Sequence, residues 1–144
     1  PVEMKRCVVK LDEKDKIKKI ARWQKISEVA AKQCGRDIIP KINNVINIQN
    51  ICDLIPKFDI LLVAYENERK NALKENLIKC KDHYSKNKKI KIGVVIGPEG
   101  GLEEKDVELL KDNGAKIITL GKRILRTETV ALSILSIIMY ELEN

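Results

Sequence analysis

Three short runs of apolar residues alternate along the chain with longer segments in which apolar and polar residues mix. The runs cover residues 59–65, 92–96 and 116–120. A strand that is apolar at nearly every position is typical of a parallel sheet that is covered on both faces. The pattern therefore predicts an α/β fold with a mostly parallel sheet and flanking helices.

The segment that precedes the first run, residues 15–34, is expected to form an amphipathic helix. Its apolar residues recur at helical spacing, at Ile20, Trp23, Ile26 and Ala30. Gly35 follows in the position where a left-handed residue commonly ends a helix. Residues 2–11 are expected to hold a short strand, and residues 43–54 a short helix.

Two more helices are expected between the strands. Residues 66–84 form the first, with apolar residues on one side at Ala72, Leu73, Leu77 and Cys80. Residues 103–113 form the second, with acidic residues in its first turn and Gly114 as its stop signal. A basic connection covers residues 86–91.

The last helix, from Val130 to about Leu142, is apolar nearly all round. Such a helix has to be buried on all faces, and a terminal element of a 144-residue domain rarely achieves this alone. We therefore expect part of it to pack in a homodimer interface. The alternative is burial against a segment outside this chain, because the sequence starts at Pro1 and is expected to be a fragment or a processed piece.

Charge and cysteine content narrow the classes of partner. The 28 Lys and Arg exceed the 21 Asp and Glu, giving a net charge of +7, which favours polyanions such as RNA. A lysine-rich proteome would give the same excess, so composition leaves both readings open.

The four cysteines are widely spaced and the chain has only one histidine, so we expect no metal site and expect the thiols to be reduced and mostly buried. That histidine, His83, lies in a polar stretch and is expected on the surface. No apolar run reaches the length of a membrane span, so we expect a cytoplasmic protein.

A glycine-rich loop, Ile96-Gly97-Pro98-Glu99-Gly100-Gly101, directly follows the second apolar run. Glycines let a backbone approach a ligand closely, and ligands collect at the carboxyl ends of parallel strands. The loop lacks the phosphate-binding glycine motifs, and Glu99 would repel a phosphate, so a neutral or cationic ligand is expected. The alternative is a tight turn with no ligand.

A second loop, Leu120 to Thr129, follows the third run and leads into the last helix. Arg123 and Arg126 could bind an anionic backbone, because a guanidinium reaches phosphate oxygens bidentately. Glu128 could pair with Arg126 or accept a proton. Equally, Thr127 or Thr129 could cap the helix, with Glu128 favourable near its N-terminus.

Taken together, the two loops resemble the RsmE family. Its members are SPOUT-class methyltransferases that modify N3 of a uridine in small-subunit ribosomal RNA. Arg22-Trp23-Gln24-Lys25-Ile26 and Gln33-Cys34-Gly35-Arg36, followed by Pro40, resemble further motifs of the same family. The likeness extends over essentially the whole chain.

The resemblance implies one SPOUT domain over residues 1–144, with a C-terminal trefoil knot that binds S-adenosylmethionine and no metal. It also implies a homodimer that acts on ribosomal RNA. The cofactor-binding residues that it implies are Ile96, Gly97, Pro98, Glu99, Gly100, Gly101, Leu120, Gly121, Arg123, Ile124, Leu125 and Thr129.

The implied chemistry is an in-line attack of uridine N3 on the sulfonium methyl group. Alignment contributes most to such a reaction. Arg126 is expected to orient the RNA or to stabilise the developing anion, and Glu128 to accept the N3 proton. Arg36, Arg123 and Arg126 are the expected RNA contacts.

Length is the main departure from the family. Its members carry an N-terminal barrel-like RNA-binding domain and a first strand–helix unit, and we expect both to be missing here. Cofactor binding is then expected to survive better than RNA binding and turnover. Two alternative functions stay open: a ribose 2′-O-methyltransferase of the same fold, and a non-catalytic RNA-binding or dimerisation module.

Overall fold

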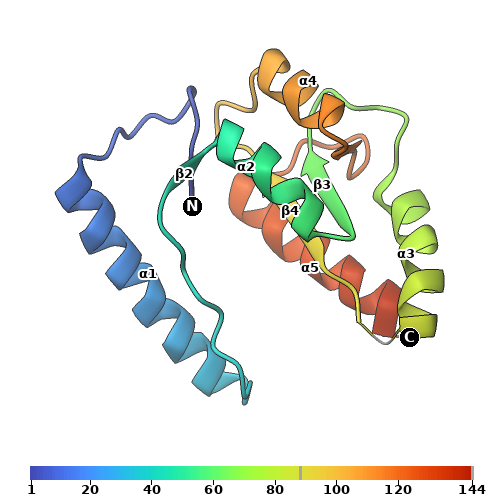
Figure 1. Ribbon diagram of the computed structural model, residues 1–144, viewed down its shortest axis with the longest axis horizontal. Helices are drawn as coiled ribbons and strands as arrows, with labels where there is room; N and C mark the ends of the chain where they lie inside the picture. The colour runs from blue at the N-terminus through green and yellow to red at the C-terminus, as the bar shows by residue number, and fades with distance from the viewer. Residues whose placement is uncertain (88, 144) are drawn as a thin grey trace.

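The computed structural model describes residues 1–87 and 89–143, and it has the expected α/β architecture (Figure 1). Position 88, in the basic connection, lies outside the described residues. The helices and strands follow one another as β1 (Val2–Glu3), α1 (Glu13–Gln33), β2 (Ile46–Asn47), α2 (Ile48–Leu54), a 3-10 turn (Ile55–Lys57), β3 (Ile60–Ala64), α3 (Leu73–Asn87), β4 (Ile92–Ile96), α4 (Glu104–Asp112), β5 (Lys116–Ile118) and α5 (Thr127–Glu143).

The three apolar runs form one parallel sheet in the order β4-β3-β5. In its register Ile60 lies opposite Ile92, and Leu62 lies opposite Lys116. A separate parallel pair joins β1 to β2. Because all strands of the larger sheet point the same way, the loops that follow them meet at one edge.

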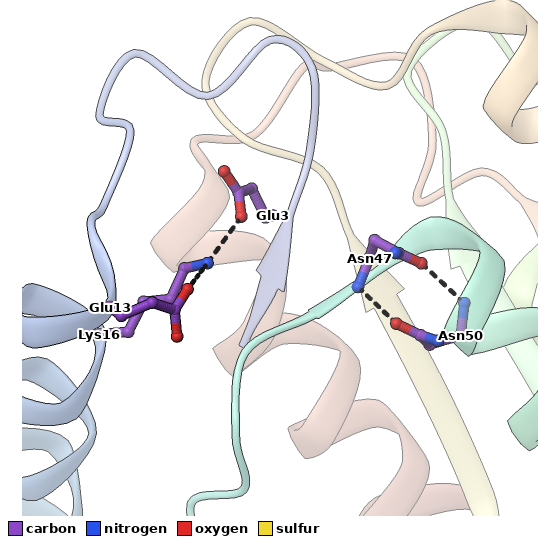
Figure 2. Close-up of polar contacts among 5 residues, drawn as sticks. All are labelled: Glu3, Glu13, Lys16, Asn47 and Asn50. Carbon is purple, nitrogen blue, oxygen red and sulfur yellow. Dashed lines mark hydrogen bonds and ion pairs between the residues drawn. The ribbon is translucent and has the colours of Figure 1, made fainter.

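Side chains of the central strand β3 alternate between two hydrophobic clusters, as the two-residue period of a strand requires. Leu61 and Val63 pack with residues of α2 and α4. Leu62, on the opposite face, packs with residues of α3 and α5. The sheet is therefore covered on both faces, as the apolar runs predict. Helix α2 is fixed at its start by a capping box, in which Asn47 and Asn50 exchange two hydrogen bonds of 2.9 and 3.1 Å (Figure 2).

Helix α5 is buried on one face only, which differs from the expectation for an all-apolar helix. Ile134 is fully buried against α3 and the sheet. The opposite face exposes an apolar stripe, with Leu132 69% exposed, Leu135 55% and Met139 50%. These three residues lie at i, i+3 and i+7 and so share one side of the helix.

Helix α1 lies to one side of the molecule, away from the three-stranded sheet (Figure 1). Its C-terminal signal is confirmed, because Gly35 has a φ of 68°. The expected burial of its apolar stripe is wrong for Ile26, which is 56% exposed, and for Ala30, which is also exposed, while Ile20 and Trp23 are half-buried. Polar contacts hold the helix instead: the Gln24 side chain accepts from the Ile42 N–H at 2.8 Å, and Ser27 Oγ donates to the Pro40 carbonyl at 2.7 Å.

The helix expected over residues 66–84 begins later, at Leu73. Residues 66–72 form a loop, because one Oε1 atom of Glu68 accepts the backbone N–H groups of Arg69, Lys70 and Asn71, at 2.8, 2.7 and 3.2 Å. A carboxylate that satisfies three consecutive N–H groups stabilises a loop in place of a helical turn. The short strand expected in residues 2–11 is confirmed only for Val2–Glu3.

The cysteines are less buried than expected. Cys52 and Cys80 are buried, and burial raises the pKa of both thiols. Cys7 is half-buried and Cys34 is exposed. His83 lies on the surface, with Nε2 3.8 Å from Asp59 Oδ1. In the part of the chain that is described, no helix has the length and apolar character needed to cross a membrane.

Candidate ligand-binding site

A cavity of about 690 Å3 lies where β3, β4 and β5 end. Its volume falls within the range of about 300–1,000 Å3 that is usual for small-molecule sites. Three segments line it: residues 64–69 after β3, residues 96–101 after β4, and residues 118–128 after β5. The structure thus brings the two loops that were singled out in the sequence to one cavity.

The loop after β4 turns tightly. The Gly101 N–H donates to the Pro98 carbonyl at 2.8 Å, which closes a four-residue turn. Gly101 has a φ of 73°, a conformation that L side chains rarely adopt. A Cβ atom there would also collide with the Glu66 carboxylate. The positive φ is the reason for glycine at this position, because the flexible Glu66 side chain could turn away from a Cβ atom.

The loop after β5 is tied to the loop after β4 by one hydrogen bond. Thr127 Oγ1 donates to the Gly97 carbonyl at 3.3 Å. Gly121, with a φ of 112°, lets the chain turn directly after the strand, and the Thr119 hydroxyl accepts from its N–H at 3.2 Å. The cavity therefore has two walls that are joined to one another.

Helix α5 starts at Thr127, so neither Thr127 nor Thr129 occupies the N-cap position suggested by the sequence. The Thr127 hydroxyl contacts the neighbouring loop instead. Arg126 and Glu128 both line the cavity. Thr129 and Arg36 do not. Thr129 is exposed in the first turn of α5, and Arg36 is exposed just beyond the end of α1.

A third wall was not foreseen from the sequence. Glu66 and Arg69, in the loop after β3, also line the cavity. The signal was present, because Glu66 follows an apolar strand just as Gly97 does. It was missed because residues 66–84 have helical spacing, and the first seven of them were therefore assigned to a helix.

This third wall is firmly held. Besides the three hydrogen bonds to Glu68, the Asn71 side chain donates to the Ile117 carbonyl at 2.6 Å. The buried Asn76 side chain donates in turn to Asn71 Oδ1 at 2.9 Å. The backbone of the loop is thus fixed to β5, and it carries Glu66 and Arg69 at a defined place on the cavity.

The Glu68 cap predicts a pH-dependent contribution to stability. Hydrogen bonds from the backbone of Lys70, Asn71 and Arg69 hold the pKa of its carboxyl below the usual 4.5. A lowered pKa means that the stabilisation is complete above pH 4.5 and is lost as the pH falls through the folded-state value. Glu68→Gln should therefore lower the free energy of unfolding by about 1 kcal/mol at neutral pH and by much less near pH 3.

Urea unfolding at the two pH values measures this difference. Glu108→Gln is the matched control, because Glu108 is exposed on α4. Its effect should be small at both pH values. An equal loss for Glu68→Gln at both pH values would show that the carboxylate charge does not stabilise the loop.

Charges along the cavity are balanced. Three carboxylates line it, those of Glu66, Glu99 and Glu128, together with three guanidinium groups, those of Arg69, Arg123 and Arg126. Such a lining fits a ligand that carries both positive and negative groups better than a polyphosphate. Within residues 1–87 and 89–143, no group of three or more His, Cys, Asp or Glu side chains is placed to hold a metal ion.

Comparison with known proteins matches the chain to one family over almost its full length. The model of the RNA methyltransferase domain family matches residues 1–139. Among curated relatives, the ribosomal RNA small subunit methyltransferase E of Bacillus subtilis is 39% identical over 143 residues, which are 99% of this chain and 55% of that protein. The chain thus spans about half the length of the curated relatives that it matches.

Solved structures agree in fold. A ribosomal RNA small subunit methyltransferase E from Neisseria gonorrhoeae, bound to S-adenosylmethionine, is 31% identical with a TM-score of 0.80, over 97% of this chain and 53% of that one. A protein from Legionella pneumophila in complex with the same cofactor is 28% identical with a TM-score of 0.83, over 97% and 53% of the two chains.

Proposed function

The chain belongs to the RsmE family of ribosomal RNA methyltransferases, and on that premise we propose that it methylates N3 of a uridine in small-subunit ribosomal RNA with S-adenosylmethionine as the methyl donor. The single observation that carries the proposal is the cavity at the three strand ends, built from two glycine-bearing loops and a charge-balanced lining. A protein with this substrate works in the cytoplasm.

The residues of the cavity fit S-adenosylmethionine chemically. The cofactor has an amino group, a carboxylate and a sulfonium, and no phosphate. Its cationic groups can find acceptors in Glu66 and Glu99, and its carboxylate can find donors in Arg69 and Arg123. At Gly101 the backbone itself lines the cavity, because glycine has no side chain. Thr129 is the one proposed cofactor residue that does not line the cavity.

We propose further that the two loops form the trefoil knot of the SPOUT fold. The supporting observation is the Thr127–Gly97 hydrogen bond, by which the segment after β5 returns to the loop after β4. Both segments line the cavity where the knot would hold the cofactor. The expectation for this knot comes from the family resemblance, since knots are nearly absent from other folds.

When bound, the cofactor supplies a methyl group that is already activated by the sulfonium. The chain then has to align the uridine and deal with its N3 proton. We assign the alignment and the stabilisation of the developing negative charge to Arg126, which lines the cavity and is exposed enough to reach RNA. Glu128, in the first turn of α5, is assigned as the proton acceptor.

Arg123 and Arg36 are proposed as further RNA contacts. Arg123 lines the cavity beside Arg126, so it can hold the phosphates that flank the target nucleotide. Arg36 is exposed but lies off the cavity, and its role would be confined to the RNA backbone farther away. The net charge of +7 supports such contacts.

Analysis of the product nucleosides tests the proposed reaction. Small-subunit ribosomal RNA that lacks base methylation is incubated with the chain and S-adenosylmethionine, then digested and analysed by mass spectrometry. We expect N3-methyluridine. A 2′-O-methylated nucleoside would establish the ribose methyltransferase instead, and RNA that binds but stays unmodified would contradict methyl transfer by this chain.

A homodimer is proposed on the exposed face of α5. The stripe of Leu132, Leu135 and Met139 leaves apolar side chains in water along about two turns of helix. Monomeric proteins rarely expose a contiguous apolar stripe of this kind without a partner. A second copy of the chain, which presents the same stripe, is a self-complementary partner.

Leu132→Asp should convert this dimer to a monomer that stays folded. Leu132 is 69% exposed, so the charge does not enter the core, whereas it would be buried in the dimer at a cost of several kcal/mol. Light scattering after gel filtration measures the mass, and circular dichroism measures the fold. Val29→Asp, at a 58% exposed site on α1, is the control. A folded dimer of Leu132→Asp would place the interface elsewhere.

A further inference from the structure

A second cavity, of about 250 Å3, lies between the N-terminal segment and the start of α1. Val2, Val8 and Val9 line it from the segment that contains β1. Trp23, Lys16 and Lys19 line it from α1. Its volume lies below the range of about 300–1,000 Å3 for drug-sized ligands, so it suits a single nucleotide base better than a whole cofactor.

One wall of this cavity is fixed by an ionic cluster (Figure 2). Lys16 Nζ lies 3.3 Å from Glu3 Oε2 on β1 and 2.9 Å from Glu13 Oε1 on α1. The Lys16 side chain is only 21% exposed, so its methylene groups cover part of the wall while its charge is paired. The cluster joins β1 to α1 at one side of the cavity.

The second cavity adjoins the cofactor cavity. Pro98 and Glu99 line both, so the tip of the loop after β4 stands between them. Arg6, in the N-terminal segment, reinforces this arrangement, because its Nη1 donates to the Gly100 carbonyl at 3.1 Å. A ligand in the second cavity would lie next to the loop that holds the cofactor.

The surroundings of the second cavity suit nucleic acid. The lining itself is charge-balanced, with Lys16 and Lys19 against Glu3 and Glu99, and the positive excess lies around it, where residues 1–22 contain eight Lys and Arg against four Asp and Glu. Trp23 supplies an aromatic ring, with Lys19 Nζ 6.0 Å from its centroid. Aromatic rings on which bases stack, together with cations that contact the backbone, are the elements of single-stranded RNA binding.

We propose that the second cavity binds one unpaired base of the substrate RNA, the neighbour of the uridine that enters the cofactor cavity. This assignment rests on the proposed function for the identity of the RNA. The base takes the place of the Lys19 ammonium over the Trp23 ring, among the three valines, and Lys19 turns to the phosphate on one side of the base. Pro98 and Glu99 separate the two cavities. A base bound in the second cavity therefore directs the neighbouring target uridine into the cofactor cavity.

Trp23 itself reports on this site, because it is the one tryptophan of the chain. Single-stranded RNA of six uridines is titrated into the protein while tryptophan emission and the anisotropy of a label on the RNA are recorded. We expect binding to quench the emission, since a stacked base quenches an indole. The same RNA with its bases removed should bind about tenfold more weakly and leave the emission unchanged.

A substitution that cannot disturb the core gives the second readout. Val8 is 91% exposed and lines the cavity, so Val8→Asp should leave the fold intact and weaken RNA binding by about tenfold. Val29→Asp is the matched control, because Val29 is an exposed valine that does not line the cavity. It should leave RNA affinity unchanged.

The outcomes separate this proposal from the proposed function. RNA that binds without quenching, equal binding of RNA without bases, an unaltered affinity of Val8→Asp or no RNA binding would each overturn the second site. Affinity for S-adenosylmethionine, measured separately by calorimetry, should be unaffected by Val8→Asp. If the unsubstituted chain bound no S-adenosylmethionine but still showed base-dependent quenching, the proposed methyltransferase activity would be refuted and the RNA site would stand.

Discussion

Gly101→Ala should weaken the binding of S-adenosylmethionine by at least about 30-fold, or roughly 2 kcal/mol. Gly101 has a φ of 73°, which costs a residue with a Cβ about 1–2 kcal/mol. The added methyl group would also collide with the Glu66 carboxylate. The Glu66 side chain can turn away from the methyl group, which displaces a carboxylate that lines the cavity, and the loop after β4 relieves the backbone strain by moving backbone that lines it. Calorimetric titration measures the affinity.

Gly114→Ala is the matched control for backbone strain. Gly114 has a φ of 102°, lies at the end of α4, and has open space around the position of a Cβ atom. This variant should lose about 1–2 kcal/mol of stability and bind the cofactor normally. If both variants bound the cofactor equally well, the loop after β4 would not be part of the cofactor site.

Arg126→Ala should lower turnover by about 100-fold to 1,000-fold and leave the affinity for S-adenosylmethionine unchanged. The effect is large because a guanidinium aimed at developing negative charge acts mainly in the transition state. Arg126 is exposed at the cavity, so its removal leaves no buried group without a partner. Rates of methyl incorporation into RNA, with calorimetry of cofactor binding, separate the two effects.

Two further variants define what Arg126 contributes. Arg126→Lys keeps the charge but loses the bidentate geometry, and it should recover only part of the rate. Lys122→Ala removes a nearby exposed cation that does not line the cavity. It should change the rate little. An equal loss in Lys122→Ala and Arg126→Ala would reduce the role of Arg126 to general attraction of RNA.

The sequence predicted the parallel sheet well, because a short run that is apolar at nearly every position fits few structures other than a buried strand. Residues 60–64 and 92–96 are apolar at nearly every position, and the structure places both as buried parallel strands. The stop signals at Gly35 and Gly114 were equally direct, since a positive φ favours glycine. Local chemistry was sufficient in each of these cases.

Predictions for α1 and α5 were less accurate, because burial depends on what a helix packs against. Apolar spacing on α1 predicted a buried face, yet Ile26 is exposed. On α5, Ile134 is buried and Leu132 is exposed, although both are equally apolar. Periodicity identifies a face that can be buried, but the partner for that face is a tertiary property.

The sequence predicted two of the three walls of the cavity. The loops after β4 and β5 could be recognised from glycines and from clustered charges, and both line the cavity. The loop after β3 has no glycine, and its helical spacing concealed it. Hydrogen bonds of Glu68 within the loop, and of Asn71 to the distant strand β5, hold the segment that brings Glu66 and Arg69 to the cavity. Helical spacing in the sequence gives no sign of these bonds.

The most direct test of the central claim is calorimetric titration of the chain with S-adenosylmethionine, with ATP as the control ligand. The charge-balanced cavity predicts binding near one site per chain for S-adenosylmethionine and much weaker binding for ATP, which has no cationic group for Glu66 and Glu99 to accept. Absence of S-adenosylmethionine binding, or equal binding of both ligands, would contradict the assignment of the cavity as the methyl-donor site.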